Sequence, residues 1–279
     1  MSDTLASSSE KHRAVSDGFA SLADAVPMLR VTERELRLWL RFWHTAVMSG
    51  VLIPLLFLGA LGIGLGNLVD DNQRSVDGLE YLVFVAPGIL AATALQSASG
   101  DSLWPIMVGL KWMRTSHAAA ATPLTPGQVY GGYVAWIGLR IMFNCTLFMV
   151  VATLLGAVPS PWGVLAIPAA TLGAVAFAAP LCAYSAVQDS DVPFPIVFRL
   201  VVMPMFLFSG TFFPVDQLPD WLEPIARITP LWHAVELCRG ATTGSIDLWP
   251  AVGHVVVLAA CVGAGWLWGT RTFTRKLAQ

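Results

Sequence analysis

The chain has 279 residues, of which only 12% are charged and 56% are hydrophobic. An average globular protein carries about twice that charged fraction, because its surface faces water. The composition therefore excludes an ordinary soluble enzyme and indicates a surface that meets lipid. A formal charge of −2 offers no basic field for nucleic acid. The four cysteines lie far apart, which excludes CxxC metal spacing and a disulfide framework.

Six apolar segments are long enough to cross a bilayer, which takes about 20 helical residues. We predict these spans near Trp43–Gly66, Tyr81–Gly100, Val129–Leu155, Trp162–Val187, Phe194–Phe213 and Leu248–Thr270. Residues 156–161 contain two prolines and a glycine, which force the turn between the third and fourth spans. The sequence therefore predicts an all-α membrane protein with a six-span domain over residues 43–270.

Basic residues outside the spans are unequally distributed between the two sides of the membrane. Eleven lie on the side of both termini and three on the other side. Because basic residues resist translocation, we expect both termini, including residues 271–279, to be cytoplasmic. The membrane is then the cytoplasmic (inner or plasma) membrane.

The chain before the first span divides into a tail and a helix. Residues 1–27 lack an apolar period and are predicted to form a flexible cytoplasmic tail. Residues 28–42 are predicted to form an amphipathic helix at the membrane interface, with its basic face toward lipid phosphates or the cytosol. That face consists of Arg30, Arg34, Arg37 and Arg41. An ordinary solvated helix is the alternative.

The segment 101–128 is too polar to cross the membrane and too apolar for a free loop. Apolar residues at helical spacing predict a short cytoplasmic helix, which Pro123 and Pro126 end. Its candidate contacts with a partner protein are Lys111, Trp112, Met113 and Arg114. A helix resting on lipid headgroups is the alternative.

The segment 214–247 is the large extracellular piece, and its prolines divide it into two short amphipathic helices at the outer leaflet. Tryptophans in it suit an interfacial aromatic belt. Candidate residues of an outer gate are Phe212, Phe213, Trp221, Trp232 and His233. Glu236 and Arg239 stand three residues apart and are predicted to pair on the second helix.

The sequence contains no P-loop motif G-x-x-x-x-G-K-[ST], so we do not expect this chain to hydrolyse ATP. The predicted spans contain no Asp or Glu, and the histidines are scattered. An intramembrane enzyme or an ion-coupled carrier needs such groups, and we assign no catalytic or metal-binding residue. Energy for transport then has to come from elsewhere, or the chain does not pump actively at all.

Polar and soft side chains within the spans are candidates for a translocation path. They are Thr93, Gln96, Ser97, Arg140, Asn144, Arg199, Met203 and Phe206. A charge at the depth of Arg140 must face protein or water, so it either meets a polar substrate group or pairs with carbonyls, Asn144 or a neighbouring helix. Arg199 either lines the path or extends to the interface, and the apolar candidates either line it or face lipid.

Three stretches resemble the type-2 ABC transporter permeases, most closely the nodulation-factor and daunorubicin-resistance exporter permeases. They are Tyr81-Leu82-x-Phe84-x-Ala86-Pro87-Gly88, Thr122-Pro123-Leu124, and Ser209-Gly210-Thr211-Phe212-Phe213-Pro214 with the downstream Glu236-x-x-Arg239-Gly240. The resemblance extends over essentially the whole chain. It implies that residues 28–42 are the connecting helix and that the segment around Trp104–Ala118 is the coupling helix that docks into an ATPase.

The resemblance also implies a transporter of two permease chains, identical or paralogous, and two cytoplasmic ABC ATPase subunits. ATP and Mg then bind to those subunits, and this chain carries no cofactor. We expect export of an amphiphilic compound, such as a drug, a glycolipid or a lipo-oligosaccharide. A polysaccharide export permease is the nearest alternative, and an ATP-independent channel or scaffold is a more distant one.

Overall fold

The computed structural model describes residues 27–65 and 79–278, and this part of the chain consists of helices joined by turns. The predicted all-α class is confirmed. Four helices are long and apolar enough to cross a membrane, namely Tyr81–Trp112, Pro126–Leu154, Pro161–Val187 and Leu248–Leu277. The shorter apolar helix Phe194–Phe208 and the helical residues from Trp43 to Leu65 correspond to the other two predicted spans.

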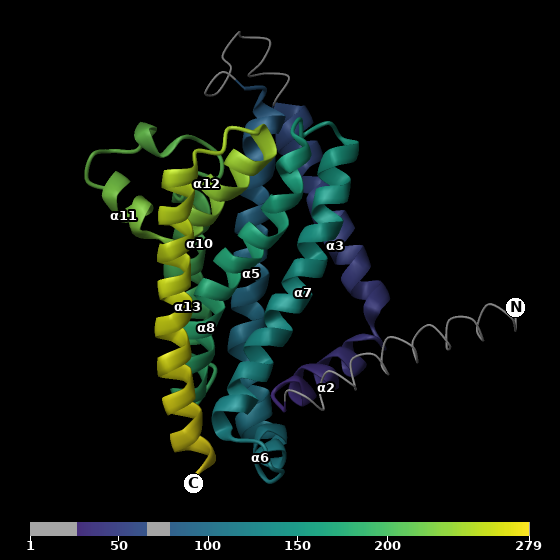
Figure 1. Ribbon diagram of the computed structural model, residues 1–279, viewed down its shortest axis with the longest axis vertical. Helices are drawn as coiled ribbons and strands as arrows, with labels where there is room; N and C mark the ends of the chain where they lie inside the picture. The colour runs from purple at the N-terminus through teal and green to yellow at the C-terminus, as the bar shows by residue number, and fades with distance from the viewer. Residues whose placement is uncertain (1–26, 66–78, 279) are drawn as a thin grey trace, which may run out of the picture.

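The helices run between two ends of an elongated bundle (Figure 1). In chain order they are α2 (Leu29–Trp39), α3 (Trp43–Phe57), η1 (Leu58–Leu65), α5 (Tyr81–Met107), η2 (Val108–Trp112), α6 (Thr115–Ala120), α7 (Pro126–Leu154), η3 (Pro161–Leu165), α8 (Ala166–Val187), α9 (Phe194–Val197), η4 (Phe198–Val202), α10 (Met203–Phe208), η5 (Val215–Gln217), α11 (Glu223–Ile228), α12 (Pro230–Thr243) and α13 (Leu248–Leu277). One end carries α6 and the C-terminus and the other carries α11 and α12, and we call them the α6 end and the α12 end.

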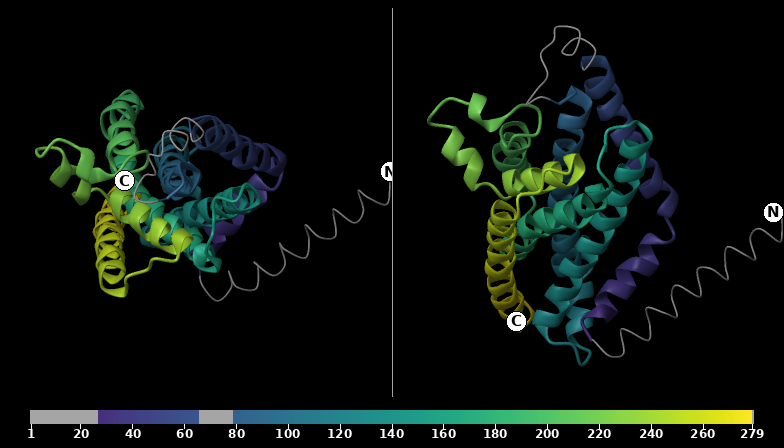
Figure 2. Two further views of the ribbon diagram at one scale, coloured as in Figure 1. Left: turned by 90° about the horizontal axis from the view of Figure 1, so that it is seen from above. Right: turned by 45° about the horizontal axis from the view of Figure 1, so that its top comes forward.

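Helix α5 forms the centre of the bundle. In the most apolar stretch of its span 78% of the residues are buried, whereas the corresponding value for α13 is 11%. Small side chains such as Ala91 and Ala98 on α5 and Ala174 and Ala178 on α8 are buried and let these helices approach closely. Helices α2 and α3 lie on the side of the bundle away from α13 (Figure 2). The outer face of α13 is therefore left for lipid or another chain.

The second span is longer than predicted. Its helix does not end at Gly100 but continues through Asp101 to Trp112. Residues 101–112 are therefore part of the span rather than a separate short helix, and only α6 forms a short helix in this segment. The break falls at Arg114, whose φ of 50° is left-handed and cannot continue a right-handed helix.

The fifth span is shorter than predicted. Its helix ends at Phe208 instead of Phe213, and Gly210 then takes a φ of 79° that a non-glycine residue rarely adopts. The predicted tail, apart from residue 27, and the end of the first span at Gly66 lie outside the described residues.

The predicted interfacial helix is present as α2, but it is fastened to the bundle. The hydroxyl of Thr32 donates a hydrogen bond to the carbonyl oxygen of Gly132 on α7 at 2.9 Å. A Cβ on Gly132 would lie 2.6 Å from the carbonyl oxygen of Met28, so only glycine permits this approach. Val31 and Leu36 are buried. Part of the apolar face therefore packs against protein rather than lipid.

Candidate transport and coupling sites

Three segments that are distant in the sequence meet at the α12 end. Gly88 of α5 lies against the turn after α10, because a Cβ at this position would be 2.5 Å from the carbonyl oxygen of Thr211. Arg239 of α12 donates a hydrogen bond to the carbonyl oxygen of Gly210 at 2.6 Å. Its guanidinium also lies 4.1 Å from the ring centre of Phe84. The predicted pair with Glu236 is confirmed, at 2.9 Å.

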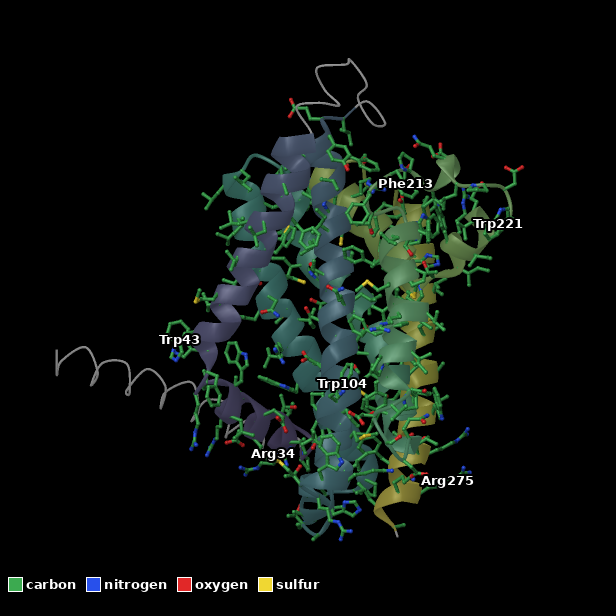
Figure 3. All side chains as sticks on the ribbon, turned by 180° about the vertical axis from the view of Figure 1, so that it is seen from behind. Arg34, Trp43, Trp104, Phe213, Trp221 and Arg275 are labelled. Atoms are coloured by element: carbon green, nitrogen blue, oxygen red, sulfur yellow. The ribbon has the colours of Figure 1, made fainter. Side chains whose placement is uncertain are left out.

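The predicted gate residues divide into a packed group and an exposed one. Phe213 and Trp232 pack on an apolar cluster formed by η5 and α11, and Phe212 contacts Phe206 at 5.3 Å between ring centres. Trp221 is 69% exposed, away from the bundle (Figure 3). The two predicted short helices are present as α11 and α12. However, α12 is built into the core, since Leu231 is completely buried.

His233 connects α12 to α13. Its Nδ1 atom lies 2.6 Å from Nδ1 of His254, and the ring of Trp232 contacts both imidazoles. Burial, together with the charge of His254, lowers the pKa of His233. The involvement of His254 was not predicted, because it stands alone within an apolar span.

The polar stripe predicted on α5 is the open face of this helix. Between Val83 and Leu103 every residue of α5 is buried except a stripe at helical spacing. Its members are Thr93, Gln96, Ser97, Gly100 and Asp101. The hydroxyl of Thr93 bonds within the helix, to the carbonyl oxygen of Ile89 at 2.7 Å. The most buried helix therefore leaves its most polar face uncovered by the described part of this chain.

Arg140 forms an ion pair with Asp101 that joins α7 to α5. The distance from Nη1 to Oδ1 is 2.7 Å, and the two side chains are 35% and 15% exposed. Of the alternatives predicted for Arg140, the structure shows the pairing with a neighbouring helix. It does not show a pairing with Asn144, whose Oδ1 has no hydrogen-bond partner among the described residues. The expectation that the spans contain no acidic residue is wrong, because Asp101 lies inside the extended α5 helix.

The other path candidates do not gather at one cavity. Arg199 and Met203 are exposed on η4 and α10. Phe206 is buried, with its ring centre 6.3 Å from that of Phe57. The structure therefore places the candidate path residues on α5, α7 and η4–α10 as separate groups.

The predicted partner contacts form the tip of the α6 end. Trp112 and Met113 are 63% and 72% exposed, and Arg114 holds the helix break next to them. Lys111 instead turns back and pairs with Asp189, in the loop after α8, at 2.7 Å. The hydrogen bond from Lys111 and the charges of Lys111 and Lys276 lower the pKa of Asp189. The tip is thereby tied to the ends of α8 and α13.

The interfacial arginines pair mainly within their own helix. Arg30 and Arg37 both contact Glu33, and Arg34 contacts Glu35. Arg34 also donates to the phenolic oxygen of Tyr133 on α7 at 2.9 Å. Arg41, which follows α2, is exposed. The basic face therefore points partly into the bundle, and Figure 3 shows Arg34 at the α6 end together with Arg275.

Comparison with known proteins agrees with this architecture. The family profile described as "ABC-2 type transporter" matches residues 28–242, so the chain belongs to the ABC-2 type transporter permeases and is a membrane-embedded transport subunit. Nodulation protein J of Rhizobium leguminosarum bv. viciae is 30% identical over 265 residues, which cover 94% of this chain and 100% of that protein. Nodulation protein J of Sinorhizobium fredii is 30% identical over 80% of this chain and 84% of its own length. The Escherichia coli inner membrane transport permease YadH is 22% identical over 87% of this chain and 92% of its own.

Proposed function

We propose that this chain is the permease subunit of an ATP-driven exporter that moves an amphiphilic compound outward across the cytoplasmic membrane. Two separate ABC ATPase subunits supply the energy and bind ATP and Mg, and this chain carries no cofactor. The α6 end faces the cytoplasm, where most basic residues lie. A second permease chain, a copy or a paralogue, completes the transporter.

The open polar face of α5 carries this proposal. A helix that is buried on all other sides would not present Gln96 and Ser97 to hydrocarbon, because unsatisfied polar groups in lipid are costly. A second chain seated against this face would enclose the stripe and create a polar lane between the two permeases. The lane would suit a substrate with a polar part and an apolar part.

The exposed tip at Trp112 and Met113 supports an ATPase partner. Large apolar side chains beside charged ones suit a protein interface, since they bury well and are oriented by the charges. The tip is connected directly to the proposed lane, because α5 and η2 form one helical span. A movement of the ATPase at the tip would therefore act on the lane.

Transport by the reconstituted complex tests the proposal. The permease and the ATPase subunits are placed in inverted membrane vesicles, together with the second permease chain if it is a paralogue. Accumulation of a fluorescent amphiphile is then measured with and without ATP. We expect ATP-dependent accumulation, which Ser97→Trp abolishes by filling the lane. Val256→Trp, on the exposed face of α13, serves as the matched control. Movement without ATP, or only into right-side-out vesicles, would contradict the proposal.

A further inference from the structure

Two adjoining grooves lie along α2 and α7. The first also reaches α5, where Asp101 at the end of the open stripe lines it, and the second lies between α2 and α7. The first has a volume of about 900 Å³ and mixes polar and aromatic residues. The second, of about 340 Å³, is lined almost entirely by apolar atoms, including those of Leu36, Leu139 and Phe143. The grooves share Trp39, Trp136 and Arg140 as a common wall.

The walls of the first groove hold polar atoms that lack partners. Four of them are buried without a hydrogen-bond partner among the described residues: Nε of Arg34, Nε1 of Trp39, Oδ2 of Asp101 and Nε of Arg140. Buried polar atoms are almost always hydrogen-bonded, because an unmade bond costs free energy. The set comprises three donors and one acceptor, all on residues that line the first groove.

The charges of the groove are balanced. Arg140 is neutralised by Asp101 and Arg34 by Glu35. A ligand with a net charge would leave one charge unmatched in a half-buried site, whereas a zwitterion would not. The three donors suit a phosphate, and the free carboxylate oxygen suits an ammonium group. Aromatic rings, here those of Trp39, Trp104 and Trp136, also attract an ammonium group.

The two grooves are ordered along the membrane normal. On α7 the polar groove extends from Tyr133 to Arg140, and the apolar groove extends from Trp136 to Thr146, which is farther from the α6 end. An amphiphile in this site therefore places its head near the α6 end and its chain toward the middle of the bilayer. This is the orientation of a lipid in the cytoplasmic leaflet.

We propose that the paired grooves bind one membrane phospholipid with a zwitterionic phosphate-and-ammonium head, of the phosphoethanolamine type. Its phosphate accepts hydrogen bonds from Arg34, Trp39 and Arg140, and its ammonium donates to Asp101. One acyl chain lies in the apolar groove. The lipid thereby joins α2 to α5 and α7, and it is a resident ligand rather than the exported compound.

Lipid retention by the purified permease tests this assignment. The protein is delipidated in detergent and exposed to an equimolar mixture of phosphatidylethanolamine and phosphatidylglycerol, and bound lipid is counted by native mass spectrometry. We expect one phosphatidylethanolamine per chain. Trp39→Phe and Arg34→Gln should each weaken binding about tenfold through the loss of a hydrogen bond to a charged group. Arg199→Gln, an exposed arginine of another element, should bind as the wild type does.

The remaining outcomes decide the question. The double variant Asp101→Asn, Arg140→Gln should lose the lipid. Where this double variant does not fold, Trp39→Phe and Arg34→Gln are sufficient for the test, because neither of them removes the ion pair between Asp101 and Arg140. Preferential retention of phosphatidylglycerol would overturn the zwitterionic assignment. Equal retention by all variants would overturn the site. Displacement of the lipid by the transported amphiphile would show that the grooves belong to the transport path.

Discussion

At the scale of single residues, Arg239 makes three different contacts at the α12 end. Its guanidinium pairs with Glu236, donates to the carbonyl oxygen of Gly210 and covers the ring of Phe84. These contacts join α12 to α5 and to the turn after α10. A planar guanidinium can make them together, whereas an ammonium group offers no such fork.

Replacing Arg239 should therefore destabilise the protein. We expect Arg239→Ala to lower the free energy of unfolding by about 3 kcal/mol, because Glu236 is left half-buried without its partner. Arg239→Lys should recover only part of this loss. Unfolding in nanodiscs measures the effect. Arg227→Ala is the control, since its pair with Glu223 is more exposed and should contribute less than about 1 kcal/mol. Equal effects of the two alanine variants would contradict this role.

The contact of Gly88 with Thr211 gives a second prediction at this scale. Gly88→Ala should cost about 1–3 kcal/mol, because its methyl group would collide with backbone rather than with a flexible side chain. Gly100→Ala, on the same helix, has no atom within 4 Å of the added carbon and should be tolerated. Thermal unfolding of the two variants compares them directly. A stable Gly88→Ala protein would show that α5 and the turn are not in tight contact.

At the scale of elements, the apolar runs predicted the helices well but did not predict where two of them end. Composition located the four long apolar helices, because charge-free runs of this length have few other uses. The second span continues past Gly100 because Arg140 pairs with Asp101 and makes the Asp101 carboxylate acceptable inside the span. The two residues are 39 positions apart in the chain. Local sequence could not show this. The stripe on α5 and the tip at Trp112 were predictable from spacing and charge, whereas the contacts of Tyr133 and His254 depend on tertiary packing.

The tip gives the prediction at the element scale. The double variant Trp112→Ala, Arg114→Gly removes both exposed side chains and preserves the helix break, since glycine readily adopts a φ of 50°. We expect normal insertion and assembly, and ATP hydrolysis that no longer drives transport. The ratio of transported compound to hydrolysed ATP is the measurement. Trp162→Ala, an exposed tryptophan of η3 at the other end, is the control. Unchanged transport by an assembled double variant would contradict the coupling role.

At the scale of the whole molecule, two open surfaces of the described bundle differ in polarity. The face of α5 is polar and narrow, whereas α13 exposes apolar residues such as Leu248 and Val256 along its length. A polar stripe in a membrane favours protein contact, and an apolar helix face favours lipid. We therefore place the second permease chain against α5 and lipid against α13.

Cysteine cross-linking distinguishes these two surfaces. In a Cys261→Ala background, Ser97→Cys should form an interchain disulfide in membranes of the assembled transporter, because both partners would present α5 to the same lane. The three other cysteines are buried. Val256→Cys is the control and should not cross-link. A paralogous partner would need its own cysteine at the matching position and would give a product of different mass. Cross-linking at Val256 alone would move the interface to α13.

The short contact between His233 and His254 makes the junction of α12 and α13 sensitive to acid on the side of the membrane where the α12 end lies. Two nitrogen atoms 2.6 Å apart can hold one proton between them, and a second proton sets two cations against each other. The pKa of His233 is lowered from 6.5, so the folded protein favours the neutral imidazole. The neutral imidazole stabilises the fold above pH 6.5, and this stabilisation is lost as the pH falls and the ring takes up a proton. Glu236 on α12 acts on His254, and Arg227 on α11 lies over the ring of Trp232, which contacts both imidazoles. We expect the melting temperature to fall on acidification, and to fall less in His254→Gln. Acid at the α12 end would then loosen the packing of α12 on α13, which neutral pH preserves.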